Sequence, residues 1–504
     1  MLKRCKIQSV AKLPLLLLSA LFITIPLAYH NIADPNFWFD ESGQFWMAKG
    51  LNHFSPPLSS DGSLYQVMLS NRQYNLDPGG FTLLLHYWLQ GGADPVWLRA
   101  LPCIFLVLTF YFLMRIAAEL SGSALVAVLA ATVSVLPFDM VLGYGFELRP
   151  YSMEVAGIVA SFFFLLRTID NPNRASLLAL GLVCSFFLTS RYSFIIAVVS
   201  IGIVLLAFTF QWSWRKFITG GYGFYIPVIC MSIAIWFISL SQQDPNGVAP
   251  FYVNGFILQA KSLPQIIDLV QINLFSLISS PYLIFIAVIL LLEILGKDVM
   301  DRPKQNCFRA ACLFLICFQI ISIVLSAMGK YPWHINTRWN INLQALVIIA
   351  STMLIVLIAD CMRSRWDNRW WKIAVVVCVF ALAAWGTNKK VHYSYDATYS
   401  QLLSLGNSKL INSEFFVGYY ASPSVRYLFE YGPLKNRKDI YPRKFYFESR
   451  QDFFQQSDIE ANRFDVALLA LVDQAGVSKY QQRFNKQFVL VSGQPLSYLL
   501  LKSP

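Results

Sequence analysis

The sequence predicts a polytopic α-helical membrane protein with a small external α/β domain at its C-terminal end. Hydrophobic residues make up 56% of the 504 residues and charged residues only 13%, whereas a soluble domain is about 25% charged. Several apolar runs of roughly 17–22 residues without charge favour spanning helices over a barrel, whose strands would alternate. Residues 388–504 differ, because their charge density is high and their apolar runs are short.

The first apolar run follows an N-terminal segment rich in lysine and arginine. No small-residue cleavage site comes after it, so it is interpreted as a retained first span with the N-terminus in the cytoplasm. The polar and aromatic segment 31–96 is then expected to be an external loop. Hydropathy predicts about eleven spans in all, near 13–28, 97–115, 123–141, 151–168, 175–190, 193–212, 222–240, 272–295, 310–328, 341–360 and 372–387.

Cations gather on alternate connections between these spans. The cation-rich side comprises the N-terminus with Arg115, Arg167, Arg174, Arg215, Lys216, Lys297, Arg302, Lys304, Arg309, Arg363, Arg365, Arg369 and Lys372. By the positive-inside rule this side is cytoplasmic. An odd number of spans then divides the chain into a transmembrane domain, 1–387, and a periplasmic or extracellular domain, 388–504.

The net charge of +12 would suggest nucleic acid as the partner of a soluble protein. Here it is assigned to cytoplasmic loops and anionic lipid, and nucleic-acid binding is not expected. The external segments contain no cysteine and the chain contains no Asn-x-Ser/Thr sequon. Both absences favour a bacterial inner membrane as the location.

The C-terminal segment has the pattern of a small α/β domain. Buried strands are expected at Glu414–Tyr420 and Phe464–Val472, a weaker strand at Lys444–Phe447, and a closing pair at Phe488–Ser492 and Leu496–Lys502. Helices are expected between them at Ser422–Tyr431, Ser449–Phe454 and Val477–Phe484.

Ionisable and hydrogen-bonding groups beside the spans gather on the external face. Ionisable groups in or near a membrane are energetically expensive, so each is a candidate functional residue. The candidates are Asp40, Glu41, Arg72, Asp77, Glu147, Arg149, Tyr151, Arg191, His334 and Arg338. The alternative for any one of them is that it pairs with a neighbour or extends to the interface.

Two kinds of chemistry suit this set. An adjacent pair of carboxylates, Asp40-Glu41, gains nothing structurally from its repulsion, and it can supply a general base for a hydroxyl nucleophile. Arginines hold a phosphate or diphosphate leaving group with a bidentate geometry that lysine lacks. Together they indicate transfer of a group from a phosphate at the outer surface of the membrane.

The segment around Asp40 is expected to form a short helix over 41–52 that lies on the bilayer, with Asp40 at its start as a capping residue. Phe37, Trp38 and Phe39 would anchor this segment in the membrane interface, and Phe45, Trp46 and Leu51 would continue the apolar stripe.

At these residues the sequence resembles the GT-C superfamily of glycosyltransferases, in particular the bacterial branch that includes protein O-mannosyltransferases and lipid A aminoarabinose transferase. The matching features, in order, are Asp40-Glu41 after the first span, a long first loop, Arg99-Ala100-Leu101-Pro102 at the entry to span two, and Glu147 through Tyr151 in the second loop. Asp77-Pro78-Gly79-Gly80-Phe81 resembles the stretch that opens the family's second juxtamembrane helix.

The resemblance implies transfer of a sugar from a polyprenyl-phosphate donor, with inversion, to an acceptor hydroxyl of a glycolipid such as lipid A, a polysaccharide or a protein. It implies Asp40 as the base, with Glu41 positioning the acceptor or tuning Asp40. Arg149, Arg338, Arg191 and Arg72 would bind the donor phosphate, and Glu147, Tyr151, Asp77 and His334 would bind substrate. No cofactor is required: no Asp-x-Asp occurs in the external loops, and nothing in the sequence requires a divalent metal.

Three other functions are compatible with many spans. A transporter or flippase would more often show matching halves with charges at the midplane of the membrane. An O-antigen polymerase or ligase would place its main residues in a large late loop. A receptor would use 388–504 as a binding module without catalysis.

Overall fold

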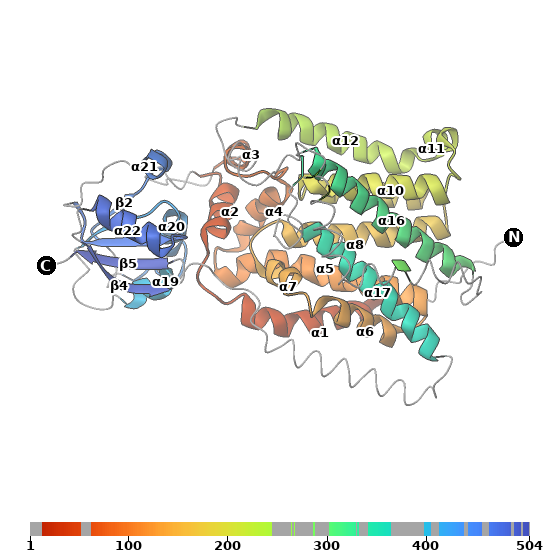
Figure 1. Cartoon of the computed structure of the whole chain (residues 1–504), viewed down its shortest axis with the longest axis horizontal. Helices are drawn as coiled ribbons and strands as arrows, with labels where there is room; N and C mark the ends of the chain where they lie inside the picture. Colours follow the sequence, from red (N-terminus) through yellow and green to blue (C-terminus); the bar gives the residue numbers. More distant parts are fainter. Residues whose placement is uncertain are drawn as a thin grey trace.

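The computed structural model describes residues 13–51, 62–243, 264, 267, 286, 287, 302–328, 330, 331, 341–363, 398–404, 413–437, 442–455, 463–484, 488–494 and 497–502. A bundle of apolar helices forms most of the molecule, and a small sheet domain adjoins one end of it (Figure 1). Three short helices of the first loop lie at the end of the bundle that faces the sheet domain (Figure 1).

Apolar helices occur where hydropathy predicts spans in the described part of the chain. The helices of the bundle are α1 (Leu13–Asn31), α5 (Pro95–Ser121), α6 (Ala124–Val135), α7 (Asp139–Phe146), α8 (Tyr151–Asp170), α9 (Arg174–Leu188), α10 (Ile195–Phe208), α11 (Trp214–Gly220), α12 (Tyr222–Ile238), α16 (Arg302–Ala327) and α17 (Ile341–Arg363). Among the described residues, 5 helices are long and apolar enough to cross a membrane, or up to 6 if one bent pair is counted. The expected spans 272–295 and 372–387 lie outside the described residues.

The expected straight span 123–141 is instead two helices. α6 and α7 meet at an angle of 89°, and Pro137 lies between them. Proline has no N–H to donate, and it disfavours a helical conformation of the residue before it. The chain therefore turns near Pro137 and approaches the second loop along α7 rather than in one straight helix.

Arg115 and Arg167, which the positive-inside rule assigns to the same side of the membrane, both lie near Glu119. Glu119 accepts a hydrogen bond from Arg115 at 2.9 Å and lies 3.7 Å from the guanidinium of Arg167. The end of α5 and the end of α8 are therefore at the same end of the bundle.

The first loop contains three helices in its described part: α2 (Phe39–Lys49), α3 (Leu64–Tyr74) and α4 (Gly80–Trp88). α3 begins with a capping box in which Ser63 and Gln66 bind each other's backbone N–H groups. α4 begins at Gly80, inside the segment expected to open a juxtamembrane helix.

The C-terminal domain is a mixed five-stranded sheet in the order β2-β1-β3-β5-β4. Its strands are β1 (Glu414–Val417), β2 (Lys444–Phe447), β3 (Val466–Ala470), β4 (Phe488–Gln494) and β5 (Ser497–Lys502), and its helices are α19 (Thr398–Ser404), α20 (Ser422–Glu430), α21 (Arg450–Gln455) and α22 (Gln474–Arg483). β1 pairs in parallel with β2 and β3, and β5 pairs antiparallel with β3 and β4. Each expected strand and helix of this domain is present.

The sheet domain docks on α2 through α20. Ser424 and Ser42 have their hydroxyl oxygens 3.2 Å apart, and Trp46 donates its indole N–H to the carbonyl of Pro423 at 3.0 Å. The ring of Tyr427 lies 5.0 Å from that of Phe45.

The expected bilayer contact of the aromatic residues around α2 is wrong. Phe37, Phe45 and Trp46 are 0% exposed and Trp38 is 6% exposed, because protein covers them. Tyr427 and Tyr431 of the C-terminal domain supply part of that cover. An apolar stripe on a short helix indicates burial but not whether lipid or protein does the burying.

Candidate active site

Asp40 lies in the first turn of α2. The helix begins after Trp38, whose side chain makes no capping bond, so Asp40 is a first-turn residue and not the expected cap. A carboxylate there still interacts favourably with the positive end of the helix. Asp40 is half-buried. One turn on, no atom of the described residues lies within 4 Å of the Cβ position of Gly43, so the described part of the chain leaves room for a side chain at that position.

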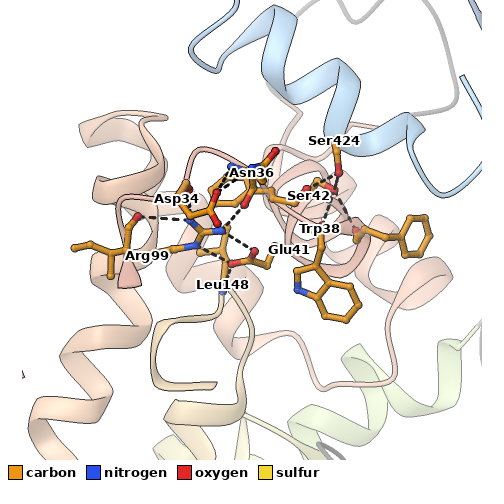
Figure 2. Close-up of polar contacts among 11 residues, drawn as sticks. Asp34, Asn36, Trp38, Glu41, Ser42, Arg99, Leu148 and Ser424 are labelled. Atoms are coloured by element: carbon orange, nitrogen blue, oxygen red, sulfur yellow. Dashed lines mark hydrogen bonds and ion pairs between the residues drawn. The ribbon is translucent and has the colours of Figure 1, made fainter. Parts of the chain in front are cut away.

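Glu41 is held in a buried ion pair with Arg99 of α5. The guanidinium donates from Nε and Nη2 to the two carboxylate oxygens at 2.9 and 2.8 Å, and both side chains are 0% exposed. The backbone N–H of Leu148 donates to the same carboxylate at 3.0 Å. Figure 2 shows Glu41 between Arg99 and Leu148, so this carboxylate joins α2, α5 and the second loop.

The remaining donors of Arg99 bind the chain that enters α2. They reach the carbonyl oxygens of Ile32, Asp34 and Asn36, the last at 2.6 Å (Figure 2). The guanidinium also stacks over the ring of Phe37, with 4.7 Å to the centroid. Arg99 thereby fixes the whole connection from α1 to the first turn of α2, in which Asp40 lies.

A buried network of amides links the three loop helices. Gln44 donates to the hydroxyl of Thr82 at 2.8 Å, and Thr82 donates to Asn71 at 2.7 Å. Asn71 donates in turn to the carbonyl of Asp77 at 2.8 Å, and Asn75 donates to Gln44 at 3.4 Å. Buried polar groups that satisfy one another in this way fix a single arrangement of α2, α3 and α4.

Arg149 of the second loop joins this network. Its Nη1 donates to the Gln44 side-chain oxygen at 3.3 Å, and its guanidinium lies 5.8 Å from the ring centroid of Tyr151. Gln44 lies one turn after Asp40 on the same side of α2, so Arg149 contacts the helix one turn from Asp40.

Arg191 also lies near Tyr151, with its guanidinium 5.0 Å from the ring centroid. It binds Glu154 of α8 at 2.8 Å and lies 3.4 Å from Asp77. Burial opposes the charge of this guanidinium, but the carboxylates of Glu154 and Asp77 outweigh it and hold the pKa of Arg191 above its ordinary value. Burial raises the pKa of the neighbouring Tyr331, which donates to Asn342 at 2.6 Å.

The other candidates lie elsewhere or outside the description. Arg72 donates to the carbonyl of Ile238 at the end of α12 at 2.7 Å, which is a helix-capping contact. Glu147 is 3% exposed and directly precedes Leu148 in the second loop. His334 and Arg338 lie outside the described residues. Within the described ranges, no group of three or more His, Cys, Asp and Glu side chains is suited to hold a metal ion.

Two important groups were not among the sequence candidates. Glu154 is a fully buried carboxylate within an apolar helix, and the rule that such groups are expensive in a membrane could have identified it. The ion pair between Glu41 and Arg99 was harder to predict. Arg99 lies near the start of an expected span, which could have marked it as a candidate, but no sequence pattern indicates which carboxylate it binds.

The chain matches no protein-family model and no curated protein by sequence. In three dimensions it is similar to the crystal structure of ArnT from Cupriavidus metallidurans in the apo state, with a TM-score of 0.54 and 10% identity over 98% of each chain. It also aligns with the cryo-EM structure of the arabinosyltransferase EmbB from Mycobacterium smegmatis, with a TM-score of 0.38 and 11% identity over 95% of this chain and 45% of that one. The chain therefore shares the fold of that ArnT structure.

Proposed function

We propose that this protein is an integral-membrane glycosyltransferase that transfers a sugar from a polyprenyl phosphate to an acceptor hydroxyl on the external face of a bacterial inner membrane. The observation that supports the proposal is the hydrogen bond from Arg149 to Gln44, which lies one turn from Asp40 on the same side of α2. The ArnT-like fold supports it. A flippase needs no such pairing of a positioned carboxylate with a bidentate phosphate ligand.

Asp40 is the proposed general base. Its carboxylate takes the proton of the acceptor hydroxyl as the acceptor oxygen forms a bond to the anomeric carbon of the sugar. The bond from that carbon to the phosphate oxygen breaks, and the polyprenyl phosphate leaves with the electron pair. One displacement of this kind inverts the anomeric centre.

Arg149 is the proposed ligand of the departing phosphate. Its guanidinium can donate two hydrogen bonds to the phosphate oxygens, on which negative charge develops as the bond breaks. Stabilising charge that develops in the transition state is usually the largest electrostatic contribution to catalysis. We assign Arg191 a different role, because Glu154 and Asp77 already balance its charge. By holding Asp77 and the face of Tyr151, it would position the loop helices around the donor sugar.

Glu41 is the proposed positioning residue for Asp40. Its carboxylate is 0% exposed and accepts hydrogen bonds from Arg99 and Leu148, so it is poorly placed to take a proton from a substrate. It would act by fixing the first turn of α2. Glu41→Gln retains its shape and is expected to reduce transfer less than the loss of the base does.

The test uses purified protein in nanodiscs, a panel of polyprenyl phosphates that carry hexoses or pentoses, and rough lipopolysaccharide as acceptor. Release of polyprenyl phosphate and mass spectrometry of the acceptor report transfer. Asp40→Asn should bind the donor but transfer about 10²–10⁴ times more slowly. Asp139→Asn is the matched control, because Asp139 is an exposed carboxylate in the first turn of α7.

Near wild-type transfer by Asp40→Asn would refute the assignment of the base and would direct attention to Glu147 or Asp77. If the wild-type protein instead moved the lipid across the bilayer without transferring its sugar, a flippase would be the better interpretation.

A further inference from the structure

The carboxyl edge of the C-terminal sheet faces the start of α2. Tyr419 and Tyr420 follow directly after β1, and both rings contact Phe39, with centroids 5.7 and 5.0 Å apart. β1 lies between the parallel strands β2 and β3. The strand that follows β1 lies toward one edge of the sheet, and the strand that follows β3 lies toward the other edge. Open α/β sheets bind ligands outside the carboxyl ends of their strands at such a switch point.

An aromatic cluster occupies this edge. Phe453 of α21 stacks on Tyr419, with centroids 5.3 Å apart and an interplanar angle of 23°, and it meets Tyr420 edge-on at 5.1 Å. Phe39, Tyr420 and Phe453 are half-buried, whereas Tyr419 is only 8% exposed. We call these four residues the aromatic platform: Tyr419 is its buried base, and the other three residues are half-buried.

A buried carboxylate fixes the base of the platform. Glu448, which follows β2, accepts from the backbone N–H of Tyr419 at 2.9 Å and from the hydroxyl of Tyr480 at 2.6 Å. Arg483 donates to its other oxygen at 2.9 Å. The turn that carries Tyr419 and Tyr420 is therefore held in one conformation, as a binding surface for a rigid ligand requires.

The platform adjoins the proposed base. Phe39 belongs to it, and both Phe39 and Asp40 lie one turn before Gly43 on α2. The described residues leave room at the Cβ position of Gly43. A sugar ring that stacked on the platform and extended toward Gly43 would therefore reach the part of α2 that carries Asp40, the proposed base.

We propose that the aromatic platform binds a sugar ring of the acceptor, so that the acceptor is a glycolipid or glycan and not a protein hydroxyl. The C–H bonds on one face of a pyranose carry partial positive charge, and the face of an aromatic ring carries negative charge, so the two stack. This inference rests on the proposed function, because the platform matters for transfer only if Asp40 is the base.

The experiment compares Tyr420→Ala, Tyr420→Phe and Tyr446→Ala in nanodiscs with rough lipopolysaccharide and with a serine- and threonine-rich peptide as acceptors. Tyr446 is a half-buried tyrosine on the same sheet that binds Glu414, away from the platform, so it controls for loss of a ring in this domain. The readouts are KM for each substrate, kcat, and thermal stability.

With lipopolysaccharide, Tyr420→Ala should raise the acceptor KM about three- to tenfold, the value of one stacking contact. Donor KM and kcat should change little. Tyr420→Phe keeps the ring and should resemble wild type, as should Tyr446→Ala.

An unchanged acceptor KM in Tyr420→Ala would overturn the proposal, and so would a fall in kcat alone, which would indicate a purely structural role. Transfer to the peptide but not to lipopolysaccharide would overturn it while leaving the proposed function intact. A wild-type protein that released polyprenyl phosphate from no donor would refute the proposed function and the platform together.

Discussion

Removal of Arg99 should destabilise the protein severely. Arg99→Met retains most of the apolar stem but removes the guanidinium, so Glu41 remains as a buried carboxylate without its ion-pair partner. Breaking a buried pair by removing one partner typically costs about 3–5 kcal/mol. We expect the upper part of this range, because the same change also removes the donors to the carbonyls of Ile32, Asp34 and Asn36.

The partner variant should be milder. Glu41→Gln still offers an oxygen to Arg99 and Leu148, and Arg99 keeps its backbone carbonyls, so the loss should be about 1.5–3 kcal/mol, typical of a hydrogen bond to a charged group. The double variant should lose less stability than the sum of the two single losses, because both single changes remove the same interaction. The matched control is Arg115→Met, because the Arg115–Glu119 pair is partly exposed and should contribute less than about 1 kcal/mol.

The assay is unfolding in mixed micelles titrated with a denaturing detergent, followed by the fluorescence of the buried tryptophans. A loss below about 1 kcal/mol for Arg99→Met, or strictly additive single losses, would refute the reasoning that this pair is desolvated and coupled.

Three further predictions concern the site and the topology. Arg149→Lys keeps the charge but loses the fork, so turnover should fall at least about tenfold with normal membrane insertion; full activity would show that simple charge suffices. Gly80→Ala places a Cβ 2.2 Å from the hydroxyl of Thr189 and should cost about 1–3 kcal/mol in thermal unfolding, whereas Gly202→Ala, which meets only an ordinary contact, should not destabilise. In a cysteine-free background, Ser400→Cys should react with a membrane-impermeant maleimide in spheroplasts; reaction only after lysis would place the C-terminal domain in the cytoplasm.

The secondary structure was predictable because the residues that become buried form short-range patterns in the sequence. Long uncharged runs predicted the apolar helices, and alternating short runs predicted each strand of the sheet domain. The error at 123–141 came from averaging hydropathy across Pro137, which hides a break that the proline itself indicates. A window average records how apolar a segment is and not whether its backbone can continue as one helix.

The candidate site was predictable in residue type but not in partnership. Asp40, Arg149 and Arg191 were predicted as candidates because ionisable groups beside spans are energetically expensive, and Tyr151 because it completes the motif of the second loop. Which guanidinium meets which carboxylate depends on tertiary packing between segments far apart in the chain. Thus Glu41 meets a helix residue 58 positions away, and no periodicity in the sequence could select it over Arg149.

The C-terminal domain, and not lipid, covers the aromatic face of α2, and this affects how the helix is oriented. If α2 lay on lipid, the bilayer would set its tilt, and the sheet domain could be an independent module. Instead Phe45 and Trp46 are buried against Tyr427 and Tyr431, while Arg99 fixes the other end of the same helix through Glu41. The helix that carries Asp40 is therefore held between the bundle and the sheet domain. The sheet domain therefore contributes, together with the bundle, to the orientation of α2 and so to that of Asp40, the proposed base.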